Sequence, residues 1–266
     1  MDEQALTGGN ATDAVVRAGD TVRKPWTPAT PSVTAYVEGL RAAGVDAPKP
    51  MGRDDRGRSV QEFVIGPSAM DVDPLSHADL RRVGSMVRRI HDASVGFVPP
   101  ADAVWETAIP APGADLVCHN DLAPWNLIVG DRWVFIDWDA SAPSTRLWDL
   151  AYAAQAFTLN DATTPPEVAA ARLTAFVDGY GADPELREAL PQAMTARTAA
   201  MLDLLKSSHR DGREPWASMY LSGHGAHWSA ALRYVETHSA RWAAALATPA
   251  SSDATADPPA RSATDA

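Results

Sequence analysis

The sequence LVCHNDLAPWN (residues 116–126), followed directly by LIVGDRWVFIDWD (residues 127–139), decides the fold of this chain. Residues 116–118 form a short apolar run that leads into a polar loop. Two further apolar runs, 127–129 and 133–136, flank a Gly-Asp turn, which is the pattern of a β-hairpin. Four polar side chains at the ends of these predicted strands should therefore gather around one loop: His119, Asp121, Asn126 and Asp137.

The spacing His-x-Asp-Leu-x-x-x-Asn is that of the catalytic loop of protein kinases, with Asn120 where those enzymes usually carry Arg. Phosphoryl transfer needs a carboxylate that orients the attacking hydroxyl and accepts its proton, and this role falls to Asp121. An amide oxygen and a second carboxylate hold the Mg²⁺ that bridges the phosphates, which assigns Asn126 and Asp137 as metal ligands. Asp is common in turns, so either carboxylate alone could be structural. The order of the four groups favours function.

Three motifs together resemble the aminoglycoside phosphotransferase / choline kinase family. They are HND at residues 119–121 with Asn126, IDW at 136–138, and WDLA at 148–151. The usual pattern of that family is His-Gly-Asp…Asn, Ile-Asp-Trp and Asp-Leu-Ala in this order, so Asn120 is a departure. In the family, the Asp of Asp-Leu-Ala braces the catalytic loop by hydrogen bonds, and Asp149 matches that position.

The resemblance is specific over residues 116–155 and weaker from Leu6 to His91. It implies an α+β, two-lobed protein-kinase-like fold with a small β-rich N-lobe and a larger, mainly helical C-lobe. We expect an N-terminal nucleotide-binding lobe over 1–66 and a C-terminal catalytic and acceptor-binding lobe over 67–248. Residues 249–266 are rich in Ala, Ser, Asp and Pro and have almost no large apolar residues, so we expect a disordered tail.

The phosphate-contacting cation is expected on a strand of the N-lobe. Residues 14–17 and 21–24 read as a hairpin, and in kinases a strand Lys contacts the phosphates. Side chains alternate along a strand, so Lys24 shares a face with Val22. Arg23 is the competing candidate, since relatives of the family can place Arg here. Both could also be solvated residues of an edge strand.

Backbone contacts to the nucleotide are expected from two further segments. Gly9, in the Gly-Gly-Asn segment before the hairpin, could bring backbone N–H groups close to phosphates, although a Gly pair before a strand is usually only a turn. Residues 61–64 should link the lobes, where the backbone of Glu62 and Val64 would meet the adenine edge. The implied co-substrate is ATP, with GTP as an alternative, and the implied metal is Mg²⁺.

A helix should follow the hairpin, with Thr30 as its N-cap, Pro31 at its first position and Gly44 at its end. Kinases place on this helix a Glu that pairs with the strand Lys. The only Glu here is Glu38, which is offset by one from the apolar face, so the ion pair with Lys24 is in doubt. The expected apolar face consists of Val33, Val37 and Leu40.

The remaining helices are predicted from caps, prolines and apolar stripes. Ser76 should cap a helix that ends near His91, with Asp79 completing a capping box. After residue 146 the chain reads as helical, and a Gly-His-Gly sequence at 223–225 should bend the last helical region. Four prolines should each begin a helical segment: Pro165, Pro184, Pro191 and Pro215.

Composition excludes several classes of protein. The chain has 266 residues, 45% of them hydrophobic, and a formal net charge of -11, which disfavours a nucleic-acid binder. Its single cysteine, Cys118, cannot form an internal disulfide and is expected to be a small buried residue. No apolar run approaches the roughly 20 residues of a membrane span. The acidic N-terminus has no signal-peptide core, so we expect a cytoplasmic protein.

These observations predict a phosphotransferase that moves the γ-phosphate of ATP, with Mg²⁺, to a hydroxyl of a small molecule. An aminoglycoside, another antibiotic, a sugar, an amino alcohol or a homoserine-like metabolite would all fit as acceptor. The alternative is a non-catalytic small-molecule-binding or immunity protein on the same fold, which the short glycine segment and the misplaced helix Glu favour. A metal-dependent hydrolase is disfavoured because the histidines show no metal-ligand spacing.

Overall fold

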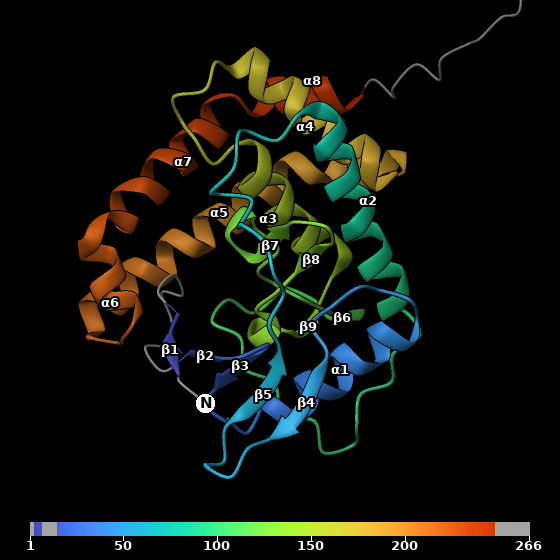
Figure 1. Cartoon of the computed structure of the whole chain (residues 1–266). Helices are drawn as coiled ribbons and strands as arrows, with labels where there is room; N and C mark the ends of the chain where they lie inside the picture. Colours follow the sequence, from blue (N-terminus) through green and yellow to red (C-terminus); the bar gives the residue numbers. More distant parts are fainter. Residues whose placement is uncertain (1–2, 7–14, 248–266) are drawn as a thin grey trace, which may run out of the picture.

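A computed structural model describes residues 3–6 and 15–247 of the chain (Figure 1). Gly9 and the predicted tail lie outside the described residues. The first part is an antiparallel sheet in the strand order β1-β2-β3-β5-β4. The β2–β3 hairpin confirms the predicted one, and Lys24 lies opposite Ser59 on the neighbouring strand. The strands are β1 (Gln4–Ala5), β2 (Val16–Ala18), β3 (Thr21–Lys24), β4 (Pro50–Arg53) and β5 (Ser59–Glu62).

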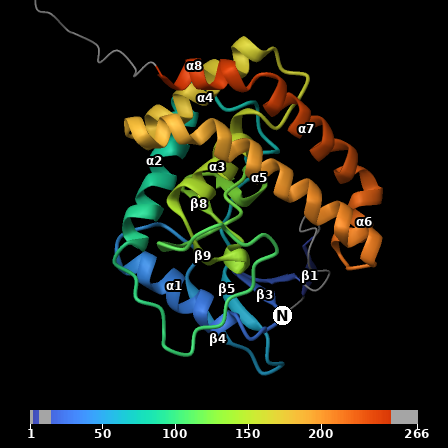
Figure 2. The same cartoon turned by 180° about the vertical axis from the view of Figure 1, so that it is seen from behind.

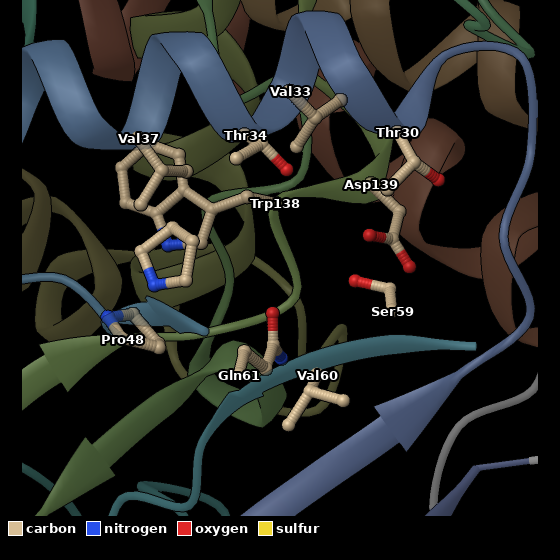
Figure 3. Close-up of a pocket in the computed structure, with 11 residues that line it drawn as sticks. Thr30, Val33, Thr34, Val37, Pro48, Ser59, Val60, Gln61, Trp138 and Asp139 are labelled. Atoms are coloured by element: carbon tan, nitrogen blue, oxygen red, sulfur yellow. The ribbon is translucent and has the colours of Figure 1, made fainter. Parts of the chain in front are cut away.

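Helix α1 (Thr30–Ala42) packs on this sheet and buries the predicted apolar face. The predicted cap is wrong by one residue: Ala29 is the N-cap, because the Thr30 side chain instead accepts a hydrogen bond from the Thr27 N–H at 2.9 Å. Gly44 follows the helix with a φ of 88°, as its predicted role at the helix end requires. Figure 3 shows the hollow between α1 and β5, which residues of both elements line, among them Val33 and Val60.

Two small hairpin-like sheets carry the catalytic stretch. Strand β6 (Leu116–Cys118) pairs with β9 (Ala142–Ser144), and β7 (Leu127–Val129) pairs with β8 (Trp133–Phe135). The second pair is the hairpin that the sequence predicts. Cys118 is fully buried, as expected, and burial raises the pKa of its thiol, so the residue packs as a neutral group. Short 3₁₀ turns, η1 (Pro124–Asn126) and η2 (Trp138–Ala140), follow the polar groups of the loop.

The connection between the two parts runs over residues 63–76, from β5 to helix α2 (His77–Ser94), and a division at 66/67 would fall within it. The predicted capping box is confirmed: the Ser76 hydroxyl accepts from the Asp79 N–H at 3.2 Å, and the Asp79 carboxylate accepts from the Ser76 N–H at 3.0 Å. Helix α2 packs against α4 (Pro166–Tyr180) of the larger part. Glycines make this contact possible, because a Cβ at Gly84 would lie 2.1 Å from the Phe176 carbonyl oxygen.

Apart from the catalytic hairpins, the larger part is almost entirely helical (Figure 2). One proline prediction is wrong: Pro191 does not begin a helix but lies inside α5. The packing of the α5 side chains maintains the helix there, although Pro191 has no backbone N–H to donate. The predicted bend is confirmed, since Gly223 adopts a φ of 113° inside the π-helical turn η3. The helices are α3 (Arg146–Thr158), α5 (Pro184–Asp211), α6 (Trp216–Met219), η3 (Tyr220–His224), α7 (Gly225–Thr237) and α8 (Ser239–Ala247).

The architecture is therefore a mixed α+β arrangement of a small antiparallel sheet with one helix and a larger helical part (Figure 1). The main hydrophobic core runs through α1, α2, α3 and α4 and reaches the strands of the catalytic stretch. A second cluster lies between α3, α5 and α7 and includes Ala123 of the catalytic loop. Within the described residues, none of the helices combines the length and the apolar character that spanning a membrane requires.

Candidate active site

Asp121 lies at the centre of the site, in the loop that follows β6. Its two carboxylate oxygens accept hydrogen bonds from different sides: Oδ2 from the Asn126 amide at 2.8 Å and Oδ1 from the Tyr152 hydroxyl at 2.7 Å. The Asn126 amide nitrogen also donates to the Asp121 backbone carbonyl at 3.0 Å. Both donor hydrogens of Asn126 are therefore directed to Asp121, which leaves its Oδ1 as the atom that can bind a metal.

His119 fastens the loop to the end of β8. Its Nδ1 accepts from the Asp121 N–H at 3.2 Å, so its Nε2 carries the hydrogen and donates to the Ile136 carbonyl at 3.1 Å. The imidazole is fully buried and packs against the Trp138 ring, with ring centroids 4.5 Å apart. Both ring nitrogens are engaged within the loop, so His119 supports the site and does not serve as a base.

Asn120 stands where the related pattern has Gly, and its backbone conformation shows why Asn can take that place. Its φ of 65° lies in the left-handed region, which Asn tolerates better than other residues with a side chain. Its backbone N–H donates to Asp149 at 2.7 Å, and its side-chain amide donates to the Ala140 carbonyl at 3.2 Å. The other Asp149 oxygen lies 2.9 Å from His91 Nε2. Asp149 therefore braces the catalytic loop, as the resemblance implies.

Lys24 reaches the carboxylate at the end of the second hairpin. Its Nζ lies 2.5 Å from Asp137 Oδ1 and 2.9 Å from Asp139 Oδ2. Burial alone would lower the pKa of Lys24, but the charges of these two carboxylates outweigh it and raise that pKa. The Lys24 charge in turn holds the pKa of Asp137 below its ordinary value. Lys24 and Asp137 are therefore charged together at neutral pH.

The alternation of side chains along β3 separates the two candidate cations. Arg23 points away from the site and pairs with Asp54, whose carboxylate is 3.4 Å from its Nε. The predicted partner on α1 is also displaced: Glu38 is exposed, and the ion pairs of Lys24 within the described part of the chain are those with Asp137 and Asp139. Lys24 is thus held from the catalytic hairpin and not from α1.

Sequence reasoning missed Asp139, although a signal was present. Asp137 and Asp139 form an Asp-x-Asp pair directly after β8, and a pair of carboxylates two residues apart is a common way to hold a divalent cation. Asp137 has a φ of 61°, which turns the chain into η2 and brings both carboxylates to Lys24.

Of the residues predicted to contact the nucleotide through their backbone, Glu62 and Val64 lie in the described part of the chain. Glu62 lies on β5, where its N–H donates to the Lys49 carbonyl at 2.9 Å and its carboxylate pairs with Arg132 at 2.5 Å. A contact from Glu62 to an adenine must therefore use its carbonyl oxygen. Val64 is buried in a small apolar cluster with Ile128, at the joint between the sheet and the catalytic hairpin. Gly9 lies outside the described residues.

Burial raises the pKa of Asp121 above that of a solvated carboxyl, although the Tyr152 hydrogen bond acts in the opposite direction. A more basic carboxylate is a better proton acceptor. Asp121 therefore combines a fixed orientation with an affinity for protons that suits a general base.

Aromatic side chains gather around Tyr152, whose hydroxyl donates to Asp121 Oδ1. The Tyr152 ring stacks on Trp228, with centroids 6.3 Å apart and planes 13° apart, and meets the edge of Trp125 at 6.5 Å. Trp216 and Tyr220 are partly buried around the same cluster. The sequence did not indicate this group, because its members come from the catalytic loop, α3, α6, η3 and α7, and only tertiary packing joins them. We call it the aromatic side: Trp125, Tyr152, Trp216, Tyr220 and Trp228.

A sequence model of a phosphotransferase enzyme family matches residues 101–191 of the chain. The chain is also 33% identical over 150 residues to the trifolitoxin immunity protein of Rhizobium leguminosarum bv. trifolii. That match spans 53% of this chain and 57%, or somewhat more than half, of the immunity protein.

Three solved structures share the fold. A choline/ethanolamine kinase family protein from Mesorhizobium loti superimposes with a TM-score of 0.58 at 19% identity, covering 93% of this chain and 92% of its own. A microcompartment-associated aminopropanol kinase gives 0.62 at 14% identity over 92% and 94%. An amicoumacin kinase in complex with AMP-PNP and Ca²⁺ gives 0.62 at 13% identity over 90% and 88%.

These comparisons confirm the resemblance to the aminoglycoside phosphotransferase / choline kinase family and the two-lobed protein-kinase-like fold. The family match supports phosphotransferase activity on a small molecule in general terms. The matched family segment contains Asp121, Asn126, Asp137 and Asp149, so the loop described above is the part of the chain most similar to known phosphotransferases.

Proposed function

We propose that this protein transfers the γ-phosphoryl group of ATP to a hydroxyl group of a small molecule. One observation carries the proposal: two pairs of side chains lie beside each other. Asn126 donates to Asp121, and Lys24, from the small sheet, pairs with Asp137. The N–H of Ile136, the residue before Asp137, donates to the Asn126 carbonyl at 2.8 Å and so joins the two pairs. A kinase-like phosphotransferase needs this set, because the protein's contribution to phosphoryl transfer is positioning and electrostatic stabilisation. A protein that only binds a ligand has no need of a complete metal site beside a raised-pKa carboxylate.

Each side chain has a defined task in this proposal. Asp121 orients the acceptor hydroxyl and takes its proton through a carboxylate oxygen. Lys24 neutralises phosphate charge, and it exchanges its contact with Asp137 for one with the nucleotide. Asp149 and His119 hold the loop so that Asp121 keeps its orientation.

The residues fit a divalent metal of the Mg²⁺ class. The Asn126 amide is oriented with its nitrogen to Asp121, so a hard oxygen is the atom it offers, and Asp137 and Asp139 add carboxylate oxygens. When bound, the ion would neutralise the negative charge that develops on the transferred phosphoryl group. The part of the chain described here would hold it through Asn126 and Asp137, with Asp139 as a further oxygen donor.

The experiment is thermal unfolding of the wild type, Asp137→Ala and Asp131→Ala, each with and without Mg²⁺ and ATP. Asp131 is the matched control, because it is an exposed carboxylate on the same hairpin. A ligand at ~100 times its dissociation constant stabilises the folded state by about 2.7 kcal/mol, or a rise in Tm of roughly 5–10 °C for a chain of this size. We expect this rise in the wild type and in Asp131→Ala, and its loss in Asp137→Ala.

The Tm values of the three proteins decide the next step. If no nucleotide shifts the Tm of any of the three proteins, the phosphotransferase proposal is wrong. If Mg-ATP shifts the Tm as expected, release of ADP is then screened against panels of hydroxyl compounds, with Asp121→Asn as the inactive reference.

A second candidate is an immunity protein that protects by binding a toxic small molecule without modifying it. The 33% identity to the trifolitoxin immunity protein favours it. The two candidates separate in one experiment, in which cells expressing wild type or Asp121→Asn are challenged with a panel of antibiotics. Protection that survives Asp121→Asn supports binding alone, whereas protection that this variant abolishes supports phosphorylation as the means of immunity.

A further inference from the structure

Asp121 is held by a side chain from the helical part of the molecule that no sequence motif indicated. Tyr152, on α3, is 3% exposed, and its hydroxyl donates to Asp121 Oδ1 at 2.7 Å. Its ring cannot turn freely, because Trp228 stacks on it. The hydrogen bond therefore comes from a donor with a fixed position, which is the condition for a residue that orients another.

Arg197, on α5, completes the arrangement from the next helix. Its guanidinium carbon lies 4.2 Å from the centroid of the Tyr152 ring, and its Nη2 donates to the Asn120 carbonyl at 3.2 Å. Asn120 is the left-handed residue directly before Asp121. One side chain thus touches both the tyrosine that holds the carboxylate and the peptide group that sets the direction of the carboxylate.

The stability of the fold does not by itself explain a buried arginine at position 197. The side chain is 5% exposed, and among the described residues its Nη1 has no hydrogen-bond partner and its guanidinium forms no salt bridge. A buried cation with an incomplete set of partners opposes folding, and an apolar side chain of similar volume would be more favourable there. A charged residue kept at such a position indicates a task in the site.

We propose that Tyr152 and Arg197 act as one positioning unit, which fixes the orientation of the Asp121 carboxylate for reaction with the acceptor hydroxyl. This inference rests on the proposed function. Asn126 holds one carboxylate oxygen and Tyr152 holds the other, so the plane of the carboxylate is set by two donors. Arg197 sets the Tyr152 ring and the Asn120 peptide together.

The unit acts on the chemical step and not on the nucleotide. Neither Tyr152 nor Arg197 contacts Lys24, Asp137 or Asp139 within the hydrogen-bond and ion-pair distances found for the described residues. A small displacement of a catalytic group can cost up to about 100-fold in rate. Loss of the unit should therefore lower kcat while binding of Mg-ATP stays the same.

The experiment compares wild type, Tyr152→Phe, Arg197→Met and the double variant. The reaction measured is release of ADP from Mg-ATP, with water as the acceptor, so that no acceptor need be known. Tyr234→Phe is the matched control, because its hydroxyl also donates one hydrogen bond, to the Thr164 carbonyl at 2.7 Å, but on α7 and away from Asp121. Asp121→Asn defines the background.

We expect each single variant to lose roughly 10-fold in kcat, with the KM for ATP within about 2-fold of the wild type. The double variant should lose no more than about the larger single loss, since two residues that act as a unit are not additive. Tyr234→Phe should keep the wild-type kcat. Thermal unfolding gives the second readout: Arg197→Met should keep or raise the Tm while kcat falls, whereas a merely structural Arg197 would lower both together.

The outcomes are distinguishable. Wild-type kcat in Tyr152→Phe, or additive losses in the double variant, would overturn the positioning unit and leave the proposed function intact. If ADP release by the wild type exceeds the Asp121→Asn background neither with water nor with any compound of the hydroxyl panel, the proposed function is overturned, and this inference with it. If Arg197→Met fails to fold, Tyr152→Phe, which keeps the buried ring, still decides the question.

Discussion

The two sides of Asp121 are built from different kinds of sequence. We call the group that would hold the metal and phosphates the carboxylate side, and three of its four members fall within residues 126–139. The aromatic side is assembled from the catalytic loop and from helices far along the chain, up to Trp228. The members of the carboxylate side are Lys24, Asn126, Asp137 and Asp139.

The difference has a physical origin. A metal and a triphosphate present the same charges to every kinase-like protein, so a short loop with fixed spacing can meet them. An acceptor is recognised by shape and apolar contact, which a few dispersed side chains supply. We therefore expect substitutions on the carboxylate side to impair the reaction with every acceptor. Substitutions on the aromatic side, apart from Tyr152, should change which acceptor is used.

The largest effect is expected for Lys24→Met. This change removes the cation that pairs with Asp137 and Asp139, and with it the neutralisation of phosphate charge, so kcat/KM for ATP should fall by about 1,000-fold. The measurement is ADP release at saturating and limiting ATP. Lys49→Met, at an exposed position on the same lobe, should keep wild-type activity. Equal activity in the two variants would mean that the carboxylate side works without its cation.

A smaller and selective effect is expected for Trp216→Ala on the aromatic side. Loss of one partly buried aromatic contact corresponds to about 1.5–3 kcal/mol, so the KM for an acceptor found by screening should rise roughly 10- to 100-fold. ADP release to water should change by less than about 3-fold. Trp133→Ala is the control. This Trp is also partly buried, but it lies on the catalytic hairpin, where Arg82 of α2 packs over its ring. A rise in the KM for ATP in Trp216→Ala would contradict the division into two sides.

The same contrast explains what the sequence could predict. His119, Asp121, Asn126 and the hairpin to Asp137 are local in the chain, and their spacing alone predicted that they meet. Strand alternation predicted that Lys24 and Arg23 face opposite ways, but only the packed sheet shows which of them faces the site.

The rest depended on contacts between distant segments. Tyr152 and Arg197 lie on two helices, and nothing in either helix indicates that the Arg197 guanidinium packs on the Tyr152 ring beside the catalytic loop. The α5 proline rule failed for a related reason, since tertiary packing of a long helix outweighs the local cost of Pro191. Fold class follows from pattern and motif, while recognition follows from packing.

An intermediate effect is expected for Asp139→Asn, which tests how Lys24 is held. If Asp139 takes the place of the helix Glu of kinases, removal of its charge should lower kcat/KM for ATP by about 10-fold. Glu38→Gln is the matched control on α1 and should have no effect, because Glu38 is exposed and Lys24 pairs elsewhere. The reverse result, in which Glu38→Gln impairs the reaction and Asp139→Asn does not, would place the anchor of Lys24 on α1.

The smallest effect is expected for an ion-pair group at the surface between the lobes, where Arg132 lies 2.5 Å from both Asp46 and Glu62. Hydrogen bonding to Arg132 lowers the pKa of Asp46. A carboxyl with a lowered folded-state pKa contributes stability above its unfolded pKa of about 4, and this stability is lost as the pH falls through the folded value. Arg132→Gln should therefore lower the free energy of unfolding by only about 0.5–1 kcal/mol at pH 7, because these side chains are nearly half exposed.

Urea unfolding at several pH values and salt concentrations tests this last expectation. The difference between wild type and Arg132→Gln should shrink below about pH 4, as the carboxyls become protonated, and also in 1 M salt, where surface charges are screened. Arg210→Gln, which breaks the more exposed pair with Asp211, should have a still smaller effect. A difference that persists at low pH and high salt would show that Arg132 acts by packing and not by charge. In that case the ion pairs of Lys24 with Asp137 and Asp139 would be the contacts through which charge holds the two lobes together at the site.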